Sequence, residues 1–566
     1  MRPARRFVIS VSIFILLSGM LASYAQDSNA TTDPVMRAMT DEINRSMTQL
    51  QFKDLDKPYF IQYITLDEEE YNASATYGAL TSSRQGRQRV LFAQVRVGDY
   101  EFDNSEFVTG NGVPPSGIIE QTIIDNDYGT MRRAFWLATD AAYKQSVEVL
   151  ARKRAYVENK IRNEEIPDFS QEAATRAIAP SRTLTFDKTL MEKQLREWSR
   201  IFRDFPDIQT SDVRLMARLT HRYLVNSEGT HTMQPAVLVS LEARGSVQAS
   251  DGMRITHSVP FYTRSLDQLP PPHEIAAAIR KLATDLTAVR NAPTLDADYS
   301  GPVMLTGAAS ADLFARVLAP NLSGQRGPLT DRPQQSSTGS ELLNRMNRPV
   351  LPAYFSVFDD PGQLRFGNQG LIGYYRVDDQ GVPAKRVSLV EDGLLTNLLM
   401  GRRPDKDRPQ SNGHGRSGFP GRETAQISNL FINVSDGKSY EELKQELIKS
   451  CRTERLQYGI LIKAIAPGGG GGIGSPVLVY KVYVADGREE LIRGVNAAGL
   501  SVASLRHIQA AGSDEIAVNR LTGFRGAETP VSVVAPSVLL EEMELKRSTG
   551  AQQKPALLTP PQTAKP

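Results

Sequence analysis

The stretch Asp298-Tyr-Ser-Gly-Pro-Val-Met-Leu-Thr-Gly307 decides how the second half of the chain is interpreted. Its apolar run Val303–Leu305 predicts a buried strand that ends in a glycine turn. A short helix is expected next, with Ser310 as its N-cap and with Pro320 and Gly324 at its end. The residues at helical spacing on one face are Leu313, Phe314, Val317 and Leu318. The pattern therefore predicts a strand that leads into a helix within a core.

The chain as a whole has the composition of a globular protein. It has 566 residues, of which 40% are apolar and 23% charged, and its formal net charge is +2. This length allows two or three domains. The balanced charge gives no electrostatic footprint for nucleic acid, which is therefore not an expected partner. The single cysteine, Cys451, lies in a helical pattern, where we expect a buried structural thiol.

The first residues are typical of a secretory signal peptide. Arg2, Arg5 and Arg6 precede an apolar run from 7 to 21, and Ser23-Tyr24-Ala25 is a small-x-small cleavage site. The apolar run is shorter than a membrane-spanning helix needs, so no stable span is expected after cleavage. The segment predicts export to the periplasm or the extracellular space.

The order of periodic segments predicts an α+β fold: an N-terminal α/β region with long helices and antiparallel sheet, then a β-rich C-terminal domain. The expected parts are a signal peptide (1–25), an N-terminal α/β domain (26–127), a middle helical and β-hairpin domain (128–295), a β-rich C-terminal domain (296–545) and a disordered tail (546–566). Helices are expected at Thr32–Leu50, Tyr128–Glu165, Lys188–Phe202, Pro272–Ala288, Tyr440–Arg455 and Leu500–Ala511. Strands expected before the C-terminal domain include Tyr59–Leu66, Tyr71–Leu80, Val90–Val97, Val213–Leu219, Arg222–Val225 and Val237–Ala249.

Several short segments of the second half resemble, in the right order, the TldD/PmbA family of peptidases. One is the strand and helix around Gly301-Pro302-Val303, and another is the hairpin Leu389–Leu395 with its Asp392-Gly393 turn. The others are Ser411–Arg416 within a flexible basic loop (401–421), Ile427–Phe431, the glycine run 467–474 and Leu521–Pro530. The resemblance covers roughly residues 50–545 and implies a C-terminal domain of the TldD/PmbA type.

The resemblance also implies where a metal site would lie. Active members carry a zinc-binding His-Glu-x-x-x-His helix and a later Cys ligand. The matching positions here are Ala315, Arg316, Pro320 and Thr522. None of these side chains offers the His, Cys or carboxylate donor that zinc requires, and an arginine cannot act as the general base. No cofactor is therefore expected.

The same resemblance implies a substrate groove for an extended polypeptide. Its candidate residues here are Asn412, Gly413, Arg416, Asn429, Gly469 and Gly470. A metal-free member would bind peptide or unfolded polypeptide, as a homodimer or as a heterodimer with a TldD-like subunit. Whether the chain is an enzyme stays open at this point.

Other catalytic patterns are weak. His273-Glu274 lacks a second histidine at zincin spacing and suits the first turn of a helix. The glycine run is not followed by Lys-Ser/Thr, and no Gly-x-Ser-x-Gly elbow occurs. The six histidines show no ligand spacing: His221, His231, His257, His273, His414 and His507. Three hypotheses remain: an exported, metal-free polypeptide-binding member or partner subunit, an exported metallopeptidase with non-standard ligands, and an envelope structural or assembly protein.

Overall fold

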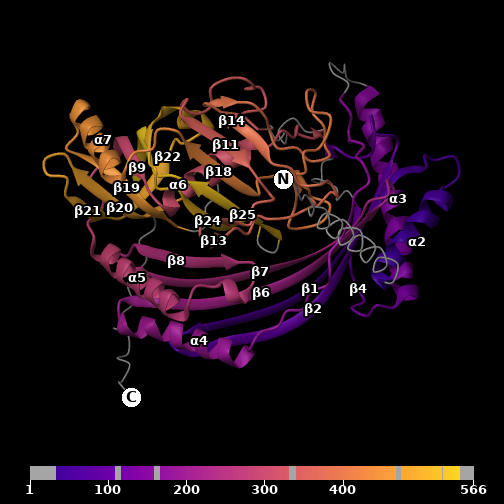
Figure 1. The fold of residues 1–566 in the computed structure, drawn as a ribbon, viewed down its shortest axis with the longest axis horizontal. Coiled ribbons are helices and arrows are strands. Elements are labelled where there is room, and N and C mark those ends of the chain that lie inside the picture. The colour runs from indigo at the N-terminus through magenta and orange to yellow at the C-terminus, as the bar shows by residue number, and fades with distance from the viewer. Residues whose placement is uncertain are drawn as a thin grey trace, which may run out of the picture.

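The computed structural model describes residues 33–108, 117–158, 166–330, 340–466, 473–524 and 527–548. The predicted signal peptide, Gly469, Gly470 and almost all of the predicted tail lie outside these ranges. The described residues have an α+β fold, as predicted, with a long N-terminal sheet and a β-rich C-terminal domain above it (Figure 1).

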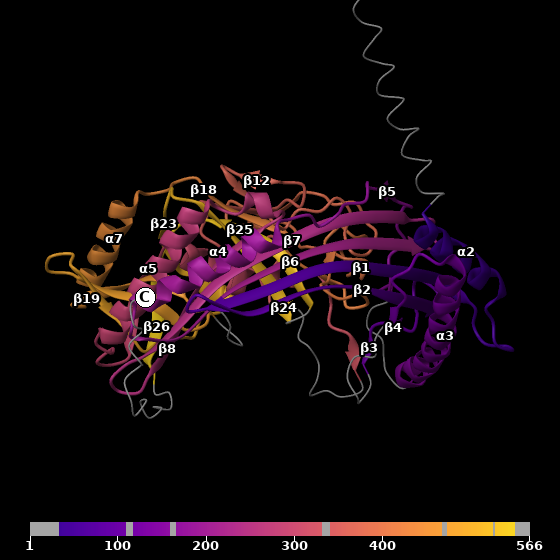
Figure 2. The same cartoon turned by 90° about the horizontal axis from the view of Figure 1, so that it is seen from below.

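The N-terminal sheet has seven strands in the order β4-β2-β1-β6-β7-β5, and β8 pairs with β7. The strands are β1 (Pro58–Thr76), β2 (Ala79–Val97), β4 (Gly117–Thr122), β5 (Arg176–Ile178), β6 (Ile208–Asn226), β7 (His231–Gln248) and β8 (Arg254–Thr263). Strands on both sides of residue 127 belong to this one sheet. Figure 2 shows the long strands arching from α4 and α5 at one end to α2 and α3 at the other.

Four helices bury their apolar faces on the sheet: α2 (Pro34–Gln49), α3 (Tyr128–Glu158), α4 (Lys188–Arg200) and α5 (Pro272–Asn291). Ile61 and Tyr63 of β1 pack in the core with α2 and α3, whereas Tyr71 and Ala73 pack in the core with α4 and α5. Because side chains alternate along a strand, these odd-numbered residues share one face. Side chains at even-numbered positions, such as Leu224 in β6, point to the C-terminal domain. The Leu224 side chain lies against Gly381 there.

The C-terminal domain consists mainly of two sheets. One has the order β15-β14-β11-β18-β25-β24, and the other has the order β21-β20-β19-β9-β26-β22, with β23 on β26. The first contains β11 (Phe355–Asp359), β14 (Val387–Glu391), β15 (Leu394–Leu395), β18 (Asn429–Val434), β24 (Ile516–Phe524) and β25 (Ala527–Ala535). The second contains β9 (Tyr299–Leu305), β19 (Tyr458–Ile465), β20 (Pro476–Tyr483), β21 (Glu489–Ile492), β22 (Val495–Ala498), β23 (Ile508–Ala511) and β26 (Val538–Arg547). Short pairs are β3 (Phe107–Val108) with β10 (Leu329–Thr330), β12 (Arg365–Phe366) with β13 (Gln369–Gly370), and β16 (Gly415–Arg416) with β17 (Thr424–Ala425).

A short helical segment lies between the two sheets and follows β9, as the sequence predicts. It consists of α6 (Ala308–Leu313), a π-helical turn η3 (Phe314–Leu318) and a 3₁₀ turn η4 (Ala319–Leu322). Helix α7 (Tyr440–Thr453) packs on the second sheet and buries Cys451, which confirms the predicted structural thiol.

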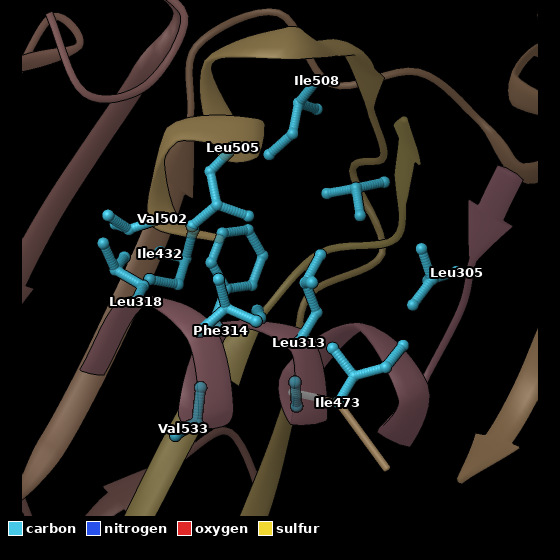
Figure 3. Close-up of a cluster of buried hydrophobic side chains, with 14 of the residues drawn as sticks. Leu305, Leu313, Phe314, Leu318, Ile432, Ile473, Val502, Leu505, Ile508 and Val533 are labelled. Atoms are coloured by element: carbon cyan, nitrogen blue, oxygen red, sulfur yellow. The ribbon is translucent and has the colours of Figure 1, made fainter. Parts of the chain in front are cut away.

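The core around this segment consists of buried apolar side chains. Phe314 and Leu318 lie among Ile432 of β18, Val533 of β25 and Leu505 of the turn η6 (Val502–His507) (Figure 3). Shortening Ile432 to Val in this setting is expected to cost about 1 kcal/mol of unfolding free energy, because the removed methylene leaves a small cavity.

Urea unfolding of Ile432→Val against Ile516→Val tests this packing. Ile432 is fully buried, whereas Ile516 is 39% exposed, so the second variant should change stability by less than about 0.5 kcal/mol. Equal effects at the two positions would contradict the packing described here.

Three local predictions are wrong. Tyr71–Leu80 is not one strand, because Tyr77 and Gly78 take positive φ angles (45° and 84°) and form the hairpin turn between β1 and β2. Leu500–Ala511 is not an α-helix, since a 3₁₀ turn is followed by β23. Ser310 is not the N-cap, because Gly307 takes that position and the buried Ser310 hydroxyl donates to the carbonyl of Pro536 (2.5 Å).

Candidate functional site

A cavity of 1080 Å³ lies between the N-terminal sheet and the C-terminal domain. Its N-terminal wall comes from β2, from the loop 104–108 and from α3. Its C-terminal wall comes from the segment 319–328, the loop 421–427 and the end of β24. The cavity is therefore lined by elements that are far apart in the sequence.

Three of the four positions matched to the family's metal site line this cavity. Ala315 and Pro320 belong to the helical segment, and Thr522 belongs to β24, about two hundred residues later in the chain. The fold thus brings these positions to one place, although the sequence spacing alone does not show it.

Arg316, at the general-base position, does not line the cavity. Its Nη2 donates to the carbonyl of Ala466 (3.4 Å), its Nε has no acceptor among the described residues, and burial lowers the pKa of its guanidinium. A cation in this setting cannot take a proton from a metal-bound water.

Zinc does not fit the side chains present. Alanine, proline and threonine at positions 315, 320 and 522 supply no His, Cys or carboxylate donor. Elsewhere in the described ranges, no three His, Cys, Asp or Glu side chains gather as a metal site. We therefore derive no chemical step through a metal at this site.

A cluster of ion pairs lies at the cavity and connects its N-terminal and C-terminal walls. Arg96 donates to Asp103 (2.7 Å), and Lys153 pairs with Asp168. Arg326 also reaches Asp168 (3.1 Å), and Nη2 of Arg403 lies 2.6 Å from a carboxylate oxygen of Glu106. Sequence reasoning missed this cluster because its members come from five separate segments.

Glu106 is unusual within this cluster. Its backbone has a φ of 59°, in the left-handed region that residues other than glycine rarely occupy. Burial raises the pKa of its carboxyl, and Arg403 opposes this shift only in part. Burial likewise lowers the pKa of Arg403. The pair is therefore held in a poorly solvated place beside the cavity.

The predicted groove residues that the structure describes lie next to the cavity lining and are not part of it. The Asn412 side chain binds the backbone of Met400 and Leu398, and Gly413 has a φ of 78° with its Cα against Pro383. Arg416 bonds to Asp379 (3.3 Å), and Asn429 bonds to the carbonyls of Asp360 and Gln363. In this structure all four hold loops in place.

The predicted flexible basic loop 401–421 is packed into the protein. Arg402 is 1% exposed, and His414 is fully buried and contacts Asp359 (3.0 Å). Ser428 also donates to Asp359, so the carboxylate stands between the serine and the histidine. This order is structural, because a serine nucleophile would need to contact the imidazole directly.

One serine does contact a histidine: Ser181 lies 3.1 Å from Nε2 of His221. The same nitrogen also accepts the backbone N–H of Arg182 (3.1 Å), and burial lowers the pKa of this imidazole. No carboxylate is recorded as a hydrogen-bond partner of Nδ1 of His221 in the described part of the chain. His273-Glu274 lies in the first turn of α5, as predicted.

Comparison with known proteins shows which proteins the second half of the chain is similar to. Residues 299–547 match the family model described as the PmbA/TldA metallopeptidase C-terminal domain. A metalloprotease of Archaeoglobus fulgidus is 27% identical over 206 residues, which cover 35% of this chain and 44% of that protein. A metalloprotease of Methanothermobacter thermautotrophicus is 25% identical over 205 residues, covering 35% of this chain and 41% of that protein. The chain spans less than half the length of these curated relatives.

Solved structures share the fold over most of the chain. TldE from Thermococcus kodakarensis is 12% identical with a TM-score of 0.57, covering 90% of this chain and 100% of that one. A Thermotoga maritima protein described as a candidate modulator of a DNA gyrase is 16% identical with a TM-score of 0.57, covering 86% and 96%. Residues 299–547, which a metallopeptidase family model matches and metalloprotease relatives resemble, therefore form a C-terminal domain of the TldD/PmbA type.

Proposed function

We propose that this protein is an exported, metal-free member of the TldD/PmbA family that binds extended polypeptide without cleaving it. The observation that carries the proposal is the convergence of Ala315, Pro320 and Thr522 on one cavity. These three positions match the family's metal site, and none of their side chains offers a His, Cys or carboxylate donor.

The cavity suits a polypeptide in size and in its borders. Its volume of 1080 Å³ lies just above the usual range of about 300–1,000 Å³ for small-molecule sites. Strand β24, which contributes Thr522 and Gly523, is an edge strand that pairs only with β25 among the described strands. An edge strand offers free backbone N–H and C=O groups to an extended chain.

Export and partnership complete the proposal. The Arg-rich start, apolar run and small-x-small site at 1–25 support export to the periplasm or extracellular space. No helix in the described ranges is long and apolar enough to cross a membrane. We infer that the mature chain pairs with a second copy or with a TldD-like subunit that carries the metal.

The experiment measures metal content, cleavage and binding on the purified mature chain. We expect no stoichiometric metal, no cleavage of an unfolded polypeptide with or without added zinc, and saturable binding of a fluorescein-labelled ten-residue peptide of Ala, Ser and Gln. Thr522→Trp should weaken binding strongly because the indole blocks the edge of β24 along which the peptide would lie. Thr453→Trp, on the exposed end of α7, should leave it unchanged.

Other outcomes would select another function. Chelator-sensitive cleavage would identify an exported metallopeptidase whose ligands lie outside the inherited positions. A folded chain that neither binds nor cleaves would favour an envelope structural or assembly role. Binding that Thr522→Trp does not reduce would mean that the peptide lies elsewhere.

A further inference from the structure

Three arginines that line the cavity have guanidinium nitrogens without a hydrogen-bond acceptor in the described residues. These are the Nε atoms of Arg96, Arg326 and Arg403. Buried donors of this kind are rare, since each loses its water without gaining an acceptor. Other arginines also have such nitrogens, and these three share the lining of one cavity, where an entering acceptor could meet their side chains.

The three arginines are not equally satisfied by the protein. Arg96 has Asp103 (2.7 Å) and Ser105 (2.8 Å) as acceptors, so its charge is compensated. Arg326 donates to the carbonyl of Pro167 (2.9 Å) and to Asp168, which Lys153 also uses. Nη2 of Arg403 lies 2.6 Å from Glu106, and its Nε has no acceptor in the part of the chain that the structure describes.

The balance of charges in the cluster also favours a negatively charged ligand. Its cations are Arg96, Lys153, Arg326 and Arg403, and its carboxylates are Asp103, Asp168 and Glu106. The cluster therefore has one cation more than it has carboxylates. Burial raises the pKa of Glu106, because a buried carboxyl is costly to ionise. The Glu106 carboxyl therefore compensates the charge of the cations less well.

We propose that Arg403 and Arg326 bind a carboxylate group of the polypeptide in the cavity. A guanidinium presents a planar fork of N–H groups that matches the two oxygens of a carboxylate. Rotation about the last bonds of the Arg403 side chain, which is 15% exposed, would turn these donors to an incoming anion. This inference rests on the proposed function, since it names the chemical group by which the same cavity selects its peptide.

The position of Arg326 limits which carboxylates can reach it. It follows Pro320 by six residues, so the two positions are at most about 20 Å apart. An extended peptide rises about 3.3 Å per residue. The bound carboxylate therefore lies within about six peptide residues of Pro320, which matches a metal ligand of the family. It is either the C-terminus of the peptide or an acidic side chain.

Three peptides separate these sources in a fluorescence anisotropy titration. They are the fluorescein-labelled Ala/Ser/Gln peptide with a free C-terminus, its C-terminal amide, and the amide with one Glu near its end. Amidation is expected to raise Kd about tenfold, the scale of one lost charge-assisted contact. If the Glu peptide restores the Kd of the free acid, the site accepts a side-chain carboxylate. If its Kd stays at that of the amide, the site requires a C-terminal carboxylate.

Variants of the chain give effects of opposite sign. Arg403→Gln or Arg326→Gln should bring the Kd of the free acid to that of the amide and leave the amide unchanged. Glu106→Gln should bind the free acid several times more tightly, because Arg403 loses its competing carboxylate. Arg506→Gln, an exposed arginine outside the cavity lining, should change neither peptide.

The two proposals fail differently. Equal Kd values for free acid and amide on the unaltered chain would overturn the carboxylate site and leave polypeptide binding intact. Absence of binding by all three peptides would overturn both. The comparison on the unaltered chain decides the matter even where Arg403→Gln does not fold.

Discussion

A chain with Ala315→His, Arg316→Glu, Pro320→His and Thr522→Cys is expected to bind one zinc ion, whereas the unaltered chain binds none. The first reason is placement, since positions 315, 320 and 522 all line the same cavity. His and Cys donors there would need to converge to about 2.0–2.3 Å from the metal. Three protein ligands would leave a fourth position for water.

The second reason is the winding of the helix. Residues five apart on an α-helix point about 140° away from one another, which does not suit two ligands of one ion. Here the amide of Ala319 donates to the carbonyl of Phe314, five residues earlier. This π-helical turn winds the chain more loosely and brings positions 315 and 320 closer to the same side.

Zinc content measured by mass spectrometry, together with a chelator competition titration, tests this expectation. The matched control keeps Arg316 and carries only the three ligand substitutions. It should bind zinc without hydrolysing peptide, because position 316 then carries an arginine in place of the glutamate that would take a proton from the metal-bound water. A quadruple variant that folds, binds the labelled peptide and holds no zinc would show that the backbone no longer supports the metal geometry.

Sequence signals that act over a few residues were sufficient for much of the fold. The Asp392-Gly393 turn was predicted from its composition, and both residues take positive φ (49° and 78°), as a type I′ hairpin requires. The strand at 303–305 was predicted from its apolar run and became the centre of a sheet. At Tyr77-Gly78 the same kind of turn was missed, because a tyrosine at its first position carries no turn signal.

Signals that depend on distant partners could not be found in this way. The loop 401–421 has the basic composition of a solvated segment, yet Arg402 and Arg416 are buried against Glu228 and Asp379. A single sequence does not show which carboxylate will meet which arginine. The positions 315, 316, 320 and 522 could be predicted only through the family resemblance, whereas nothing in the sequence singled out Arg326, Arg403 and Glu106.

Replacing Arg402 with alanine is expected to cost about 3–5 kcal/mol of unfolding free energy, because a buried carboxylate loses its cation. Arg402 is 1% exposed and joins the C-terminal domain to two N-terminal segments. Its Nε donates to the carbonyl of Ser170 (3.2 Å), and its Nη2 donates to Glu228 (2.7 Å). The guanidinium also lies 3.9 Å from the ring centre of Phe169, which lines the cavity.

Urea unfolding of Arg402→Ala should therefore show a large loss, with Arg402→Lys between it and the unaltered chain, since lysine keeps the charge and loses the fork. Arg506→Ala, at an exposed position, should stay within about 0.5 kcal/mol. A loss below about 1 kcal/mol for Arg402→Ala would mean that water reaches Glu228 when the arginine is removed.

Because Arg402 holds one wall of the cavity beside Arg403, a folded Arg402→Ala chain should also bind the free-acid peptide more weakly than the unaltered chain does. Stability and polypeptide binding would then depend on the same contact between the two parts of the molecule.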